Sequence, residues 1–157
     1  NYYPKINQTM KIPPSMMMGS WMGSDFTNDD LVRETSLTRD YLARLASKTN
    51  LRGKTAKIVL EPKKTTITVW GKIVIDVDLS EKLPVKQVYY DEAGKKIRTL
   101  FFRKLKKFGK ILLPSELEMK PEIASKRGHR TIVRYRSLEE TNLGETFFSR
   151  RNLRRKP

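Results

Sequence analysis

Apolar and polar residues alternate along most of the chain, and the alternation is clearest in residues 70–79. There Ile73 and Ile75 belong to a row of apolar side chains at every second position, which is typical of a half-buried strand. Related patterns predict further strands at residues 38–46, 55–61, 85–90, 96–106, 111–119 and 130–138. Gly94 closes a predicted hairpin turn because such turns need a residue that tolerates positive φ. Connections are short and no long helical pattern alternates with the strands, so the order predicts an antiparallel meander of mainly β structure.

The two ends of the chain follow different patterns. Residues 2–13 predict two short strands joined by a turn, and residues 15–24, rich in Met and Gly, predict a loop. A short helix is predicted next, ending near residue 34 or 35. Thr27 is its expected N-cap and Asp30 completes a capping-box variant that suits the positive end of the helix dipole. The last segment, residues 145–155, predicts a short helical turn.

The predicted sheet has one apolar and one polar face, and a single curved sheet cannot bury its own apolar face. Something must cover it. The candidates are the Met-rich loop, the helix at residues 27–34, and any chain that precedes residue 1. The length of 157 residues fits a single domain over residues 1–157, long enough to form a core without disulfides.

The charge is strongly positive and unevenly distributed. There are 33 Lys and Arg against 17 Asp and Glu, a formal net charge of +16. Residues 1–47 have five residues of each sign, so the whole excess lies in residues 48–157. A field of this size attracts polyanions, among them nucleic acid, an anionic membrane surface, lipopolysaccharide or an acidic partner protein.

The sequence gives little support for catalysis. Cys is absent, which excludes disulfides, thiolate nucleophiles and Cys-ligated zinc. His129 is the single His and has no triad spacing around it. Asp76 and Asp78 lie on one strand face and form a candidate acid–base pair, but a solvated strand end explains them better. We therefore expect no enzyme activity, no cofactor and no metal.

One further carboxylate group lies at the predicted helix start. Asp25, Asp29 and Asp30 are close enough in sequence to bind a cation together. Capping of the helix N-terminus explains them better, because carboxylates stabilise that end of a helix.

Two other clusters each allow two interpretations. The Met residues and Trp21 of the 15–24 loop suit an adaptable apolar pocket, because Met is flexible and polarisable, or they fill the core of an ordinary barrel. Phe101 and Phe102 alternate with basic residues, as in sheets that stack nucleic-acid bases, or they follow ordinary strand alternation. As neighbours on one strand, these two rings point to opposite faces.

Several segments resemble the LolA-like outer-membrane lipoprotein-sorting protein family, and the resemblance extends over essentially the whole chain. The most specific match is the run at residues 20–33. Further matches are residues 4–7, 12–18, 69–72, 83–84, 90–95 and 147–155. The resemblance implies an incomplete, half-open β-barrel made of a curved antiparallel sheet covered by a short helix and loop, as in LolA and LolB.

The resemblance also implies a location and partners. Family members are periplasmic proteins of Gram-negative bacteria, with a signal peptide, a helix and several strands upstream of the region matched here. We therefore expect this chain to be the larger C-terminal part of such a domain, with its signal peptide upstream. The implied partners are lipid or lipoprotein acyl chains, an anionic membrane surface and an inner-membrane transporter of the resistance–nodulation–division class.

The leading hypothesis is a carrier that holds acyl chains in an apolar cavity for transfer towards the outer membrane. Its expected acyl-chain contacts, in the part that matches the family motif, are Met16, Met17, Met18, Trp21, Met22, Phe26 and Leu31. Its expected contacts with an anionic surface or partner are Lys95, Lys96, Lys104, Lys106, Lys107, Arg150, Arg151, Arg154 and Arg155. The alternative hypotheses are a basic nucleic-acid-binding β-domain and a structural adaptor whose cavity is only a core.

Overall fold

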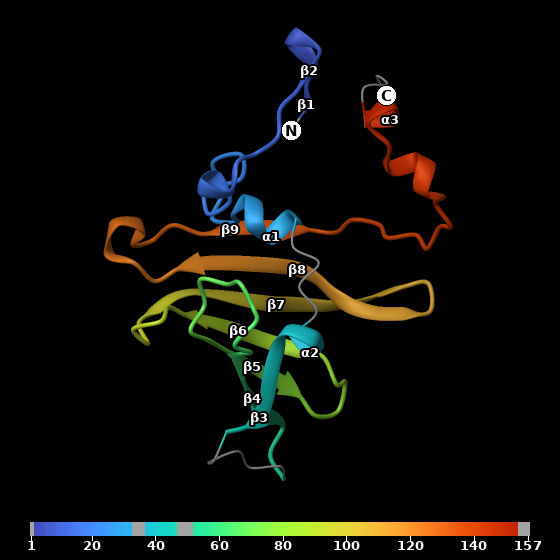
Figure 1. The fold of residues 1–157 in the computed structure, drawn as a ribbon. Helices are drawn as coiled ribbons and strands as arrows, with labels where there is room; N and C mark the ends of the chain where they lie inside the picture. The colour runs from blue at the N-terminus through green and yellow to red at the C-terminus, as the bar shows by residue number, and fades with distance from the viewer. Residues whose placement is uncertain (1, 33–36, 47–51, 154–157) are drawn as a thin grey trace.

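A seven-stranded antiparallel sheet forms the body of the molecule in the computed structural model, which describes residues 2–32, 37–46 and 52–153. The strands are β3 (Tyr41–Leu45), β4 (Thr55–Pro62), β5 (Lys72–Asp78), β6 (Pro84–Tyr90), β7 (Lys96–Phe108), β8 (Ile111–Pro121) and β9 (Thr131–Arg134). Each strand pairs with the next along the chain, so β3 and β9 are the two edges of an open sheet (Figure 1). This arrangement confirms the predicted meander and the half-open, unclosed barrel.

Short elements flank the sheet. They are β1 (Tyr2–Tyr3), β2 (Gln8–Thr9), the α-helices α1 (Asn28–Val32), α2 (Leu37–Asp40) and α3 (Arg150–Leu153), and 3₁₀ turns at Pro4–Ile6, Pro14–Met16, Ala124–Lys126 and Glu145–Phe148. Helices α1 and α2 lie over the same face of the sheet, whereas the β1–β2 hairpin and α3 project beyond the β9 edge (Figure 1). No helix in the described ranges has the length and apolar character that crossing a membrane requires.

The predicted start of the helix at residue 27 is confirmed in atomic detail. The Thr27 hydroxyl accepts a hydrogen bond from the Asp30 backbone N–H at 3.2 Å, and the Asp30 carboxylate accepts one from the Thr27 N–H at 2.8 Å. This reciprocal pair satisfies donors that a helix end otherwise leaves free. The hairpin turn is also confirmed, with Gly94 at φ +78°.

The strand predicted at residues 38–46 is wrong in its first part. Residues Leu37–Asp40 form the helical turn α2, and the strand begins only at Tyr41. The carbonyl of Asp40 accepts hydrogen bonds from the Lys63 N–H at 3.0 Å and the Thr66 hydroxyl at 2.6 Å. These partners come from a loop more than twenty residues away, so local alternation gave no sign of them.

The other predicted strands differ mainly in length, and two of them are much shorter than expected. The second strand within residues 2–13 is reduced to Gln8–Thr9, and the one at 130–138 to Thr131–Arg134. The helical turn predicted at residues 145–155 is present as a 3₁₀ turn followed by α3. The end of the helix predicted near residue 34 lies outside the described residues.

The core lies on the face that α1 and α2 cover. Its buried cluster comprises Tyr41, Leu60, Trp70, Ile73 and Ile75, with Leu37 of α2 packed against it. Strand register places Leu60 opposite Ile73 and Ile73 opposite Tyr89, so one row of apolar side chains runs across β4, β5 and β6. Of the covers expected for the apolar face, the helix predicted from residue 27 is present as α1, and it is joined by α2 and the loop that carries Trp70, which the sequence did not indicate (Figure 1).

Candidate functional site

A small cavity lies between the covered face of the sheet and helices α1 and α2. Its volume is about 180 Å³. The residues that line it are Asp29, Asp30, Leu37, Tyr41, Trp70, Ile73, Gln87 and Tyr89. Apolar groups from α2 and β5 thus face polar groups from α1 and β6, which is the composition expected of a ligand pocket.

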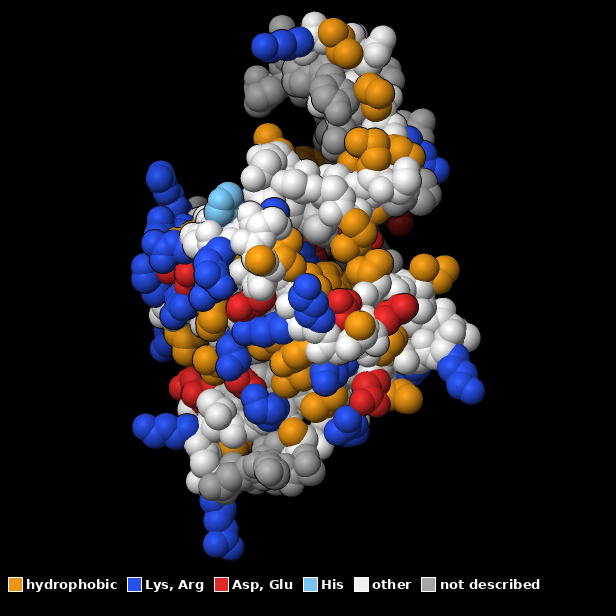
Figure 2. Space-filling model, turned by 90° about the vertical axis from the view of Figure 1, so that its left-hand side faces the viewer, with side chains coloured by type: hydrophobic (Ala, Val, Ile, Leu, Met, Phe, Trp, Pro, Cys, Tyr) orange, Lys and Arg blue, Asp and Glu red, His pale blue; other side chains and the backbone are white. Residues whose placement is uncertain are grey.

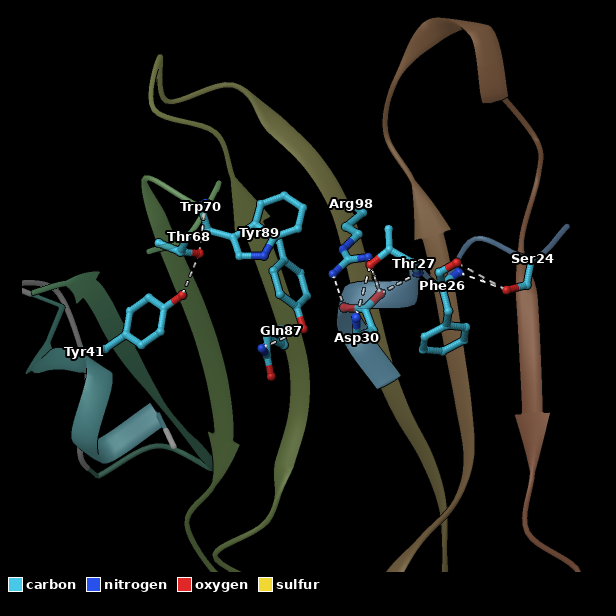
Figure 3. A network of polar contacts seen from close by, with 10 residues as sticks. All are labelled: Ser24, Phe26, Thr27, Asp30, Tyr41, Thr68, Trp70, Gln87, Tyr89 and Arg98. Atoms are coloured by element: carbon cyan, nitrogen blue, oxygen red, sulfur yellow. Dashed lines mark hydrogen bonds and ion pairs between the residues drawn. The ribbon is translucent and has the colours of Figure 1, made fainter. Parts of the chain in front are cut away.

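Arg98 lies beside this cavity, and its guanidinium contacts two of the aromatic rings that line it. The centre of the guanidinium is 4.6 Å from the Trp70 ring centroid and 4.4 Å from the Tyr89 ring centroid. The residue is only 5% exposed. Contacts of this kind are strongest when water is excluded, so the two rings hold the buried charge in place (Figure 3).

The same guanidinium binds the carboxylate of Asp30 on α1. Two hydrogen bonds of 2.7 and 2.5 Å join the two terminal nitrogens of Arg98 to the two carboxylate oxygens. This two-point geometry is the strongest form of ion pair in proteins. Burial on its own would raise the pKa of Asp30, but the hydrogen bonds and charge of Arg98, together with the bonds from Thr27, lower that pKa below its ordinary value.

One polar atom of this group has no partner. The Nε atom of Arg98 is buried and makes no hydrogen bond within the described part of the chain. Unpaired buried donors are rare and cost stability. The ion pair with Asp30 and the two rings therefore offset this cost and keep Arg98 inside the fold.

The polar wall of the cavity consists of Gln87 and Tyr89 on β6. The side-chain amide nitrogen of Gln87 donates to the Tyr89 hydroxyl at 2.9 Å. Burial raises the pKa of Tyr89 to about 12, so this hydroxyl keeps its proton at any physiological pH. On the neighbouring wall the hydroxyls of Tyr41 and Thr68 are paired at 3.2 Å (Figure 3).

None of the seven residues predicted to contact acyl chains lines this cavity. Met16, Met18, Met22 and Leu31 are exposed, by 60%, 41%, 85% and 55% respectively. Met17, Trp21 and Phe26 are partly buried. The structure therefore separates the Met-rich loop from the cavity, although Asp29 and Asp30, which do line it, follow that loop directly in α1.

The Met-rich loop is anchored to the sheet by a carboxylate. Asp25 accepts a hydrogen bond from the Thr131 hydroxyl at 2.9 Å and pairs with Lys126 at 3.3 Å. The hydroxyl of Thr131 also accepts a bond from the Asp25 N–H at 2.9 Å. Asp25 therefore fixes the loop to edge strand β9, while Asp30 caps α1 and binds Arg98.

In the described ranges no three His, Asp or Glu side chains gather as metal ligands.

The paired aspartates of β5 serve as structural ion-pair and turn residues. Asp76 binds Lys57 at 2.5 Å and Lys86 at 2.9 Å, across both neighbouring strands. Asp78 accepts hydrogen bonds from Ser80 and from the N–H of Glu81 in the following turn. Asp78 thus lies at a strand end, as the sequence suggested, whereas Asp76 is only 18% exposed and is held by ion pairs within the sheet.

Many basic side chains on the outer face are paired with acids. Glu116 binds Lys104 and Arg134, both at 2.8 Å, and Lys96 binds Glu122 at 2.8 Å. Figure 2, which looks at the left-hand side of Figure 1, likewise shows acidic side chains (red) between Lys and Arg side chains (blue). The positive field is therefore strongest where such pairing is absent.

Three of the predicted surface cations, all on or next to β7, make no side-chain ion pair with an acid within the described part of the chain. Lys106 donates to the Arg136 carbonyl at 3.0 Å rather than to a carboxylate, and Lys95 and Lys107 are exposed with no ion pair in the described chain. Arg151 is exposed on α3. Arg150 belongs to the same helix, and Arg154 and Arg155 lie outside the described residues.

Two of the aromatic rings among these basic residues already contact cations of the same strand. The Arg103 guanidinium lies 4.8 Å from the Phe101 ring centroid, and the Lys106 ammonium lies 5.2 Å from that of Phe108. Phe102 points to the opposite face, where strand register places it beside Leu117. These cations and rings thus form cation–π contacts with one another within β7.

Of the residues that line the cavity, the sequence singled out Asp29 and Asp30, but not Gln87 or Tyr89, nor Arg98 beside them. Gln87 and Arg98 are polar residues at positions whose strand neighbours on the same face are apolar, since Gln87 pairs with Ile75 and Leu100. That mismatch is a readable signal. It could have shown that both side chains are buried. It could not have shown that Arg98 binds Asp30, which is 68 residues away in sequence.

Comparisons with known proteins agree with this fold. The protein-family model that matches the chain carries the description "Uncharacterized protein" and covers residues 1–155. The chain belongs to that family. No curated protein matches it.

Three solved structures have the same fold. A DUF1329 family protein from Desulfovibrio piger superposes with a TM-score of 0.81 at 22% identity, over 97% of this chain and 62% of the other. An outer membrane lipoprotein-sorting protein domain from Vibrio parahaemolyticus gives 0.80 at 23% identity, over 98% and 64%.

A LolA superfamily protein from Nitrosomonas europaea gives a TM-score of 0.72 at 17% identity, over 96% of this chain and 66% of the other. The fold is therefore LolA-like, as the sequence resemblance implied. The chain spans slightly less than two thirds of the length of these relatives.

Proposed function

We propose that this protein is a carrier that holds acyl chains of a lipid or lipoprotein between its sheet and helices α1 and α2. The observation that supports the proposal most strongly is the apolar face of an open sheet, roofed by two short helices with a cavity beneath them. Carriage of this kind needs apolar contact, worth about 0.8 kcal/mol per buried CH₂, and involves no chemical step.

The size of the cavity bears on how such a carrier works. A volume of about 180 Å³ is small beside the roughly 300–1,000 Å³ of ordinary ligand pockets. A long acyl chain therefore enters only when the roof moves away from the sheet. Helix α1 has a single turn or little more, and its link to the sheet includes the polar Asp30–Arg98 contact, which can reform after the chain leaves.

The proposal includes a location and partners drawn from the relatives. One relative is described as an outer membrane lipoprotein-sorting protein domain. By analogy we place this chain in the periplasm and direct its transfer towards the outer membrane, from an inner-membrane transporter of the resistance–nodulation–division class. Lys106 and Lys107 of β7, which have no acidic partner within the described part of the chain, are then part of the surface that meets an anionic membrane.

An apolar fluorescent dye tests the carrier function. Delipidated protein should enhance the emission of 1-N-phenylnaphthylamine, and long-chain lipids should displace the dye. Leu37→Trp fills the cavity from α2 and should reduce dye binding at least tenfold. Leu42→Trp is the matched control because Leu42 is 61% exposed on the edge strand.

Native mass spectrometry of the freshly purified protein supplies an independent readout, in which a co-purifying lipid is expected. Absence of bound lipid together with absence of dye binding would rule out the carrier. An equal reduction of dye binding in Leu37→Trp and Leu42→Trp would show that the dye does not bind specifically in the cavity.

A further inference from the structure

The cavity contains two polar groups whose hydrogen-bonding capacity is only partly used. Gln87 is 8% exposed and its side chain makes one hydrogen bond, to the Tyr89 hydroxyl. Within the described part of the chain, no other partner binds its carbonyl oxygen, and the Tyr89 hydroxyl has no acceptor for its hydrogen. Both side chains line the cavity, so the unused capacity faces the space that a ligand would fill.

The pair offers at least one donor and at least one acceptor whichever way the amide of Gln87 is turned. With the amide nitrogen towards Tyr89, the Gln87 carbonyl oxygen remains as acceptor and the Tyr89 hydroxyl as donor. With the amide reversed, the Gln87 NH₂ remains as donor and the Tyr89 oxygen as acceptor. The complement of such a pair is a neutral group that itself both donates and accepts, such as a primary or secondary amide or a hydroxyl.

The charges around the cavity disfavour an anionic group. Among the described residues that line it, the ionisable side chains apart from the two tyrosines are Asp29 and Asp30, and both are acids. Arg98, a described cation beside the cavity, is bound at both terminal nitrogens by Asp30. Among the residues that the structure describes around the cavity, a ligand carboxylate would therefore lose its hydration next to acids and find no cation that is not already bound to a carboxylate, which is costly in a buried site.

We propose that Gln87 and Tyr89 select an acyl ligand through a neutral amide or hydroxyl group next to its chain, and discriminate against a free carboxylate. This inference rests on the proposed carrier function and names the ligand class of the same cavity. A ligand group that pairs with the Gln87 amide and the Tyr89 hydroxyl gains hydrogen bonds that a mismatched group cannot make once it has displaced water from the cavity, which makes such sites selective.

Displacement of 1-N-phenylnaphthylamine from the wild-type protein tests the selectivity without any mutation. Dodecanamide and dodecanoate have chains of equal length and differ in the charge and donor capacity of the head. At pH 7.5 we expect dodecanamide to displace the dye at a concentration about tenfold lower than dodecanoate. Dodecanol, which is also neutral and a donor, should behave like the amide.

Three variants locate the effect. Gln87→Leu and Tyr89→Phe each remove polar atoms with little change of shape, and Tyr89→Phe keeps the ring that contacts Arg98. Either change should reduce the amide preference to less than threefold while the dye still binds. Tyr90→Phe is the matched control, because Tyr90 follows Tyr89 on β6 but is not among the described residues that line the cavity, so loss of its hydroxyl should leave the preference unchanged.

The outcomes separate the two proposals. Equal displacement by amide and carboxylate, or an unchanged preference in both Gln87→Leu and Tyr89→Phe, overturns the selectivity while leaving the carrier function intact. Failure of any chain to displace dye from the wild-type protein overturns the carrier function and the selectivity with it. Near-ultraviolet circular dichroism identifies a variant that has lost its fold, and the wild-type comparison then decides alone.

Discussion

The guanidinium of Arg98 on β7 and the carboxylate of Asp30 on α1 are joined by two hydrogen bonds of 2.7 and 2.5 Å, across 68 residues of sequence. The Arg98 side chain is 6% exposed and that of Asp30 is 20% exposed. The pair therefore links the short helix to the sheet where water has little access. Its loss should affect stability far more than the loss of a surface ion pair.

Replacement of Asp30 by Asn should lower the free energy of unfolding by about 3–5 kcal/mol, because it leaves the buried charge of Arg98 without a partner. Urea unfolding followed by tryptophan fluorescence measures the change. The control is Arg44→Met, which breaks an exposed pair with Glu61 and should cost less than about 1 kcal/mol. Similar losses in the two variants would contradict the structural role of the pair.

The same carboxylate should make stability depend on pH. The folded state lowers the pKa of Asp30, so the unfolded chain binds a proton first as the pH falls. The stabilisation is complete above the unfolded pKa of about 3.9 and is lost as the pH falls through the folded value.

Thermal melting of the wild-type protein and Asp30→Asn between pH 6 and pH 2.5 measures this contribution. Asp76, Glu116 and Glu122 also have lowered pKa values and contribute an acid-dependent loss common to both proteins. The wild-type protein should lose more stability than the variant below about pH 4. Parallel curves would show that Asp30 does not titrate with unfolding.

Gly71 should not tolerate a side chain. A Cβ at this position would lie 2.8 Å from the Glu92 Cα and would also meet the carbonyl oxygen of Asp91. The backbone has little room to move, because the Gly71 N–H donates to the Tyr90 carbonyl at 3.0 Å. Gly71→Ala should therefore destabilise the protein by about 1–3 kcal/mol in urea unfolding.

Gly144→Ala is the matched control for this overpacking. The nearest atom to its Cβ is 3.9 Å away and the backbone φ is −65°, so the change should stay within about 0.5 kcal/mol. If Gly71→Ala left the free energy of unfolding unchanged, the loop at residues 91–92 would have to move aside at little cost, contrary to this prediction.

Membrane binding should depend on the Lys residues that lack an acidic partner. Lys106→Gln with Lys107→Gln should weaken binding to phosphatidylglycerol vesicles about tenfold or more, since each Lys near an anionic surface contributes about 1 kcal/mol. Lys57→Gln with Lys86→Gln removes the same net charge, but Asp76 already neutralises part of it. The second pair should therefore have the smaller effect in sedimentation assays.

Ionic strength provides a further check on the vesicle result. Binding of exposed charges should decline steeply between 50 mM and 500 mM salt, because screening shortens the range of their field. Binding that is equal in both double variants and insensitive to salt would contradict an electrostatic membrane surface.

Features that depend on residues close together in sequence were predictable, and features that depend on distant residues were not. The capping box of Thr27 and Asp30 was predictable because its partners are three residues apart. The turn at Gly94 was predictable for the same reason. The helical turn of α2 was not, because its carbonyls are satisfied by Lys63 and Thr66 in a distant loop.

The candidate site was the least predictable part. The composition of the Met-rich loop predicted an apolar pocket there, yet Met16 and Met22 are mostly exposed and the cavity lies elsewhere. That this loop contacts acyl chains stays a prediction. Gln87 and Tyr89 looked like ordinary strand residues, because nothing in their neighbourhood along the chain shows that a helix forms a cavity above them.

By itself, the sequence determined the antiparallel meander, the helix start and the uneven charge, since alternation, capping and composition are local properties. Only the tertiary structure decided where charge is neutralised and where a ligand can fit. Strand register set Asp76 between Lys57 and Lys86, and the packing of α1 over the sheet brought Asp30 to Arg98. Contacts between residues far apart in sequence depend on how whole elements pack, so the cavity became visible only in the folded chain.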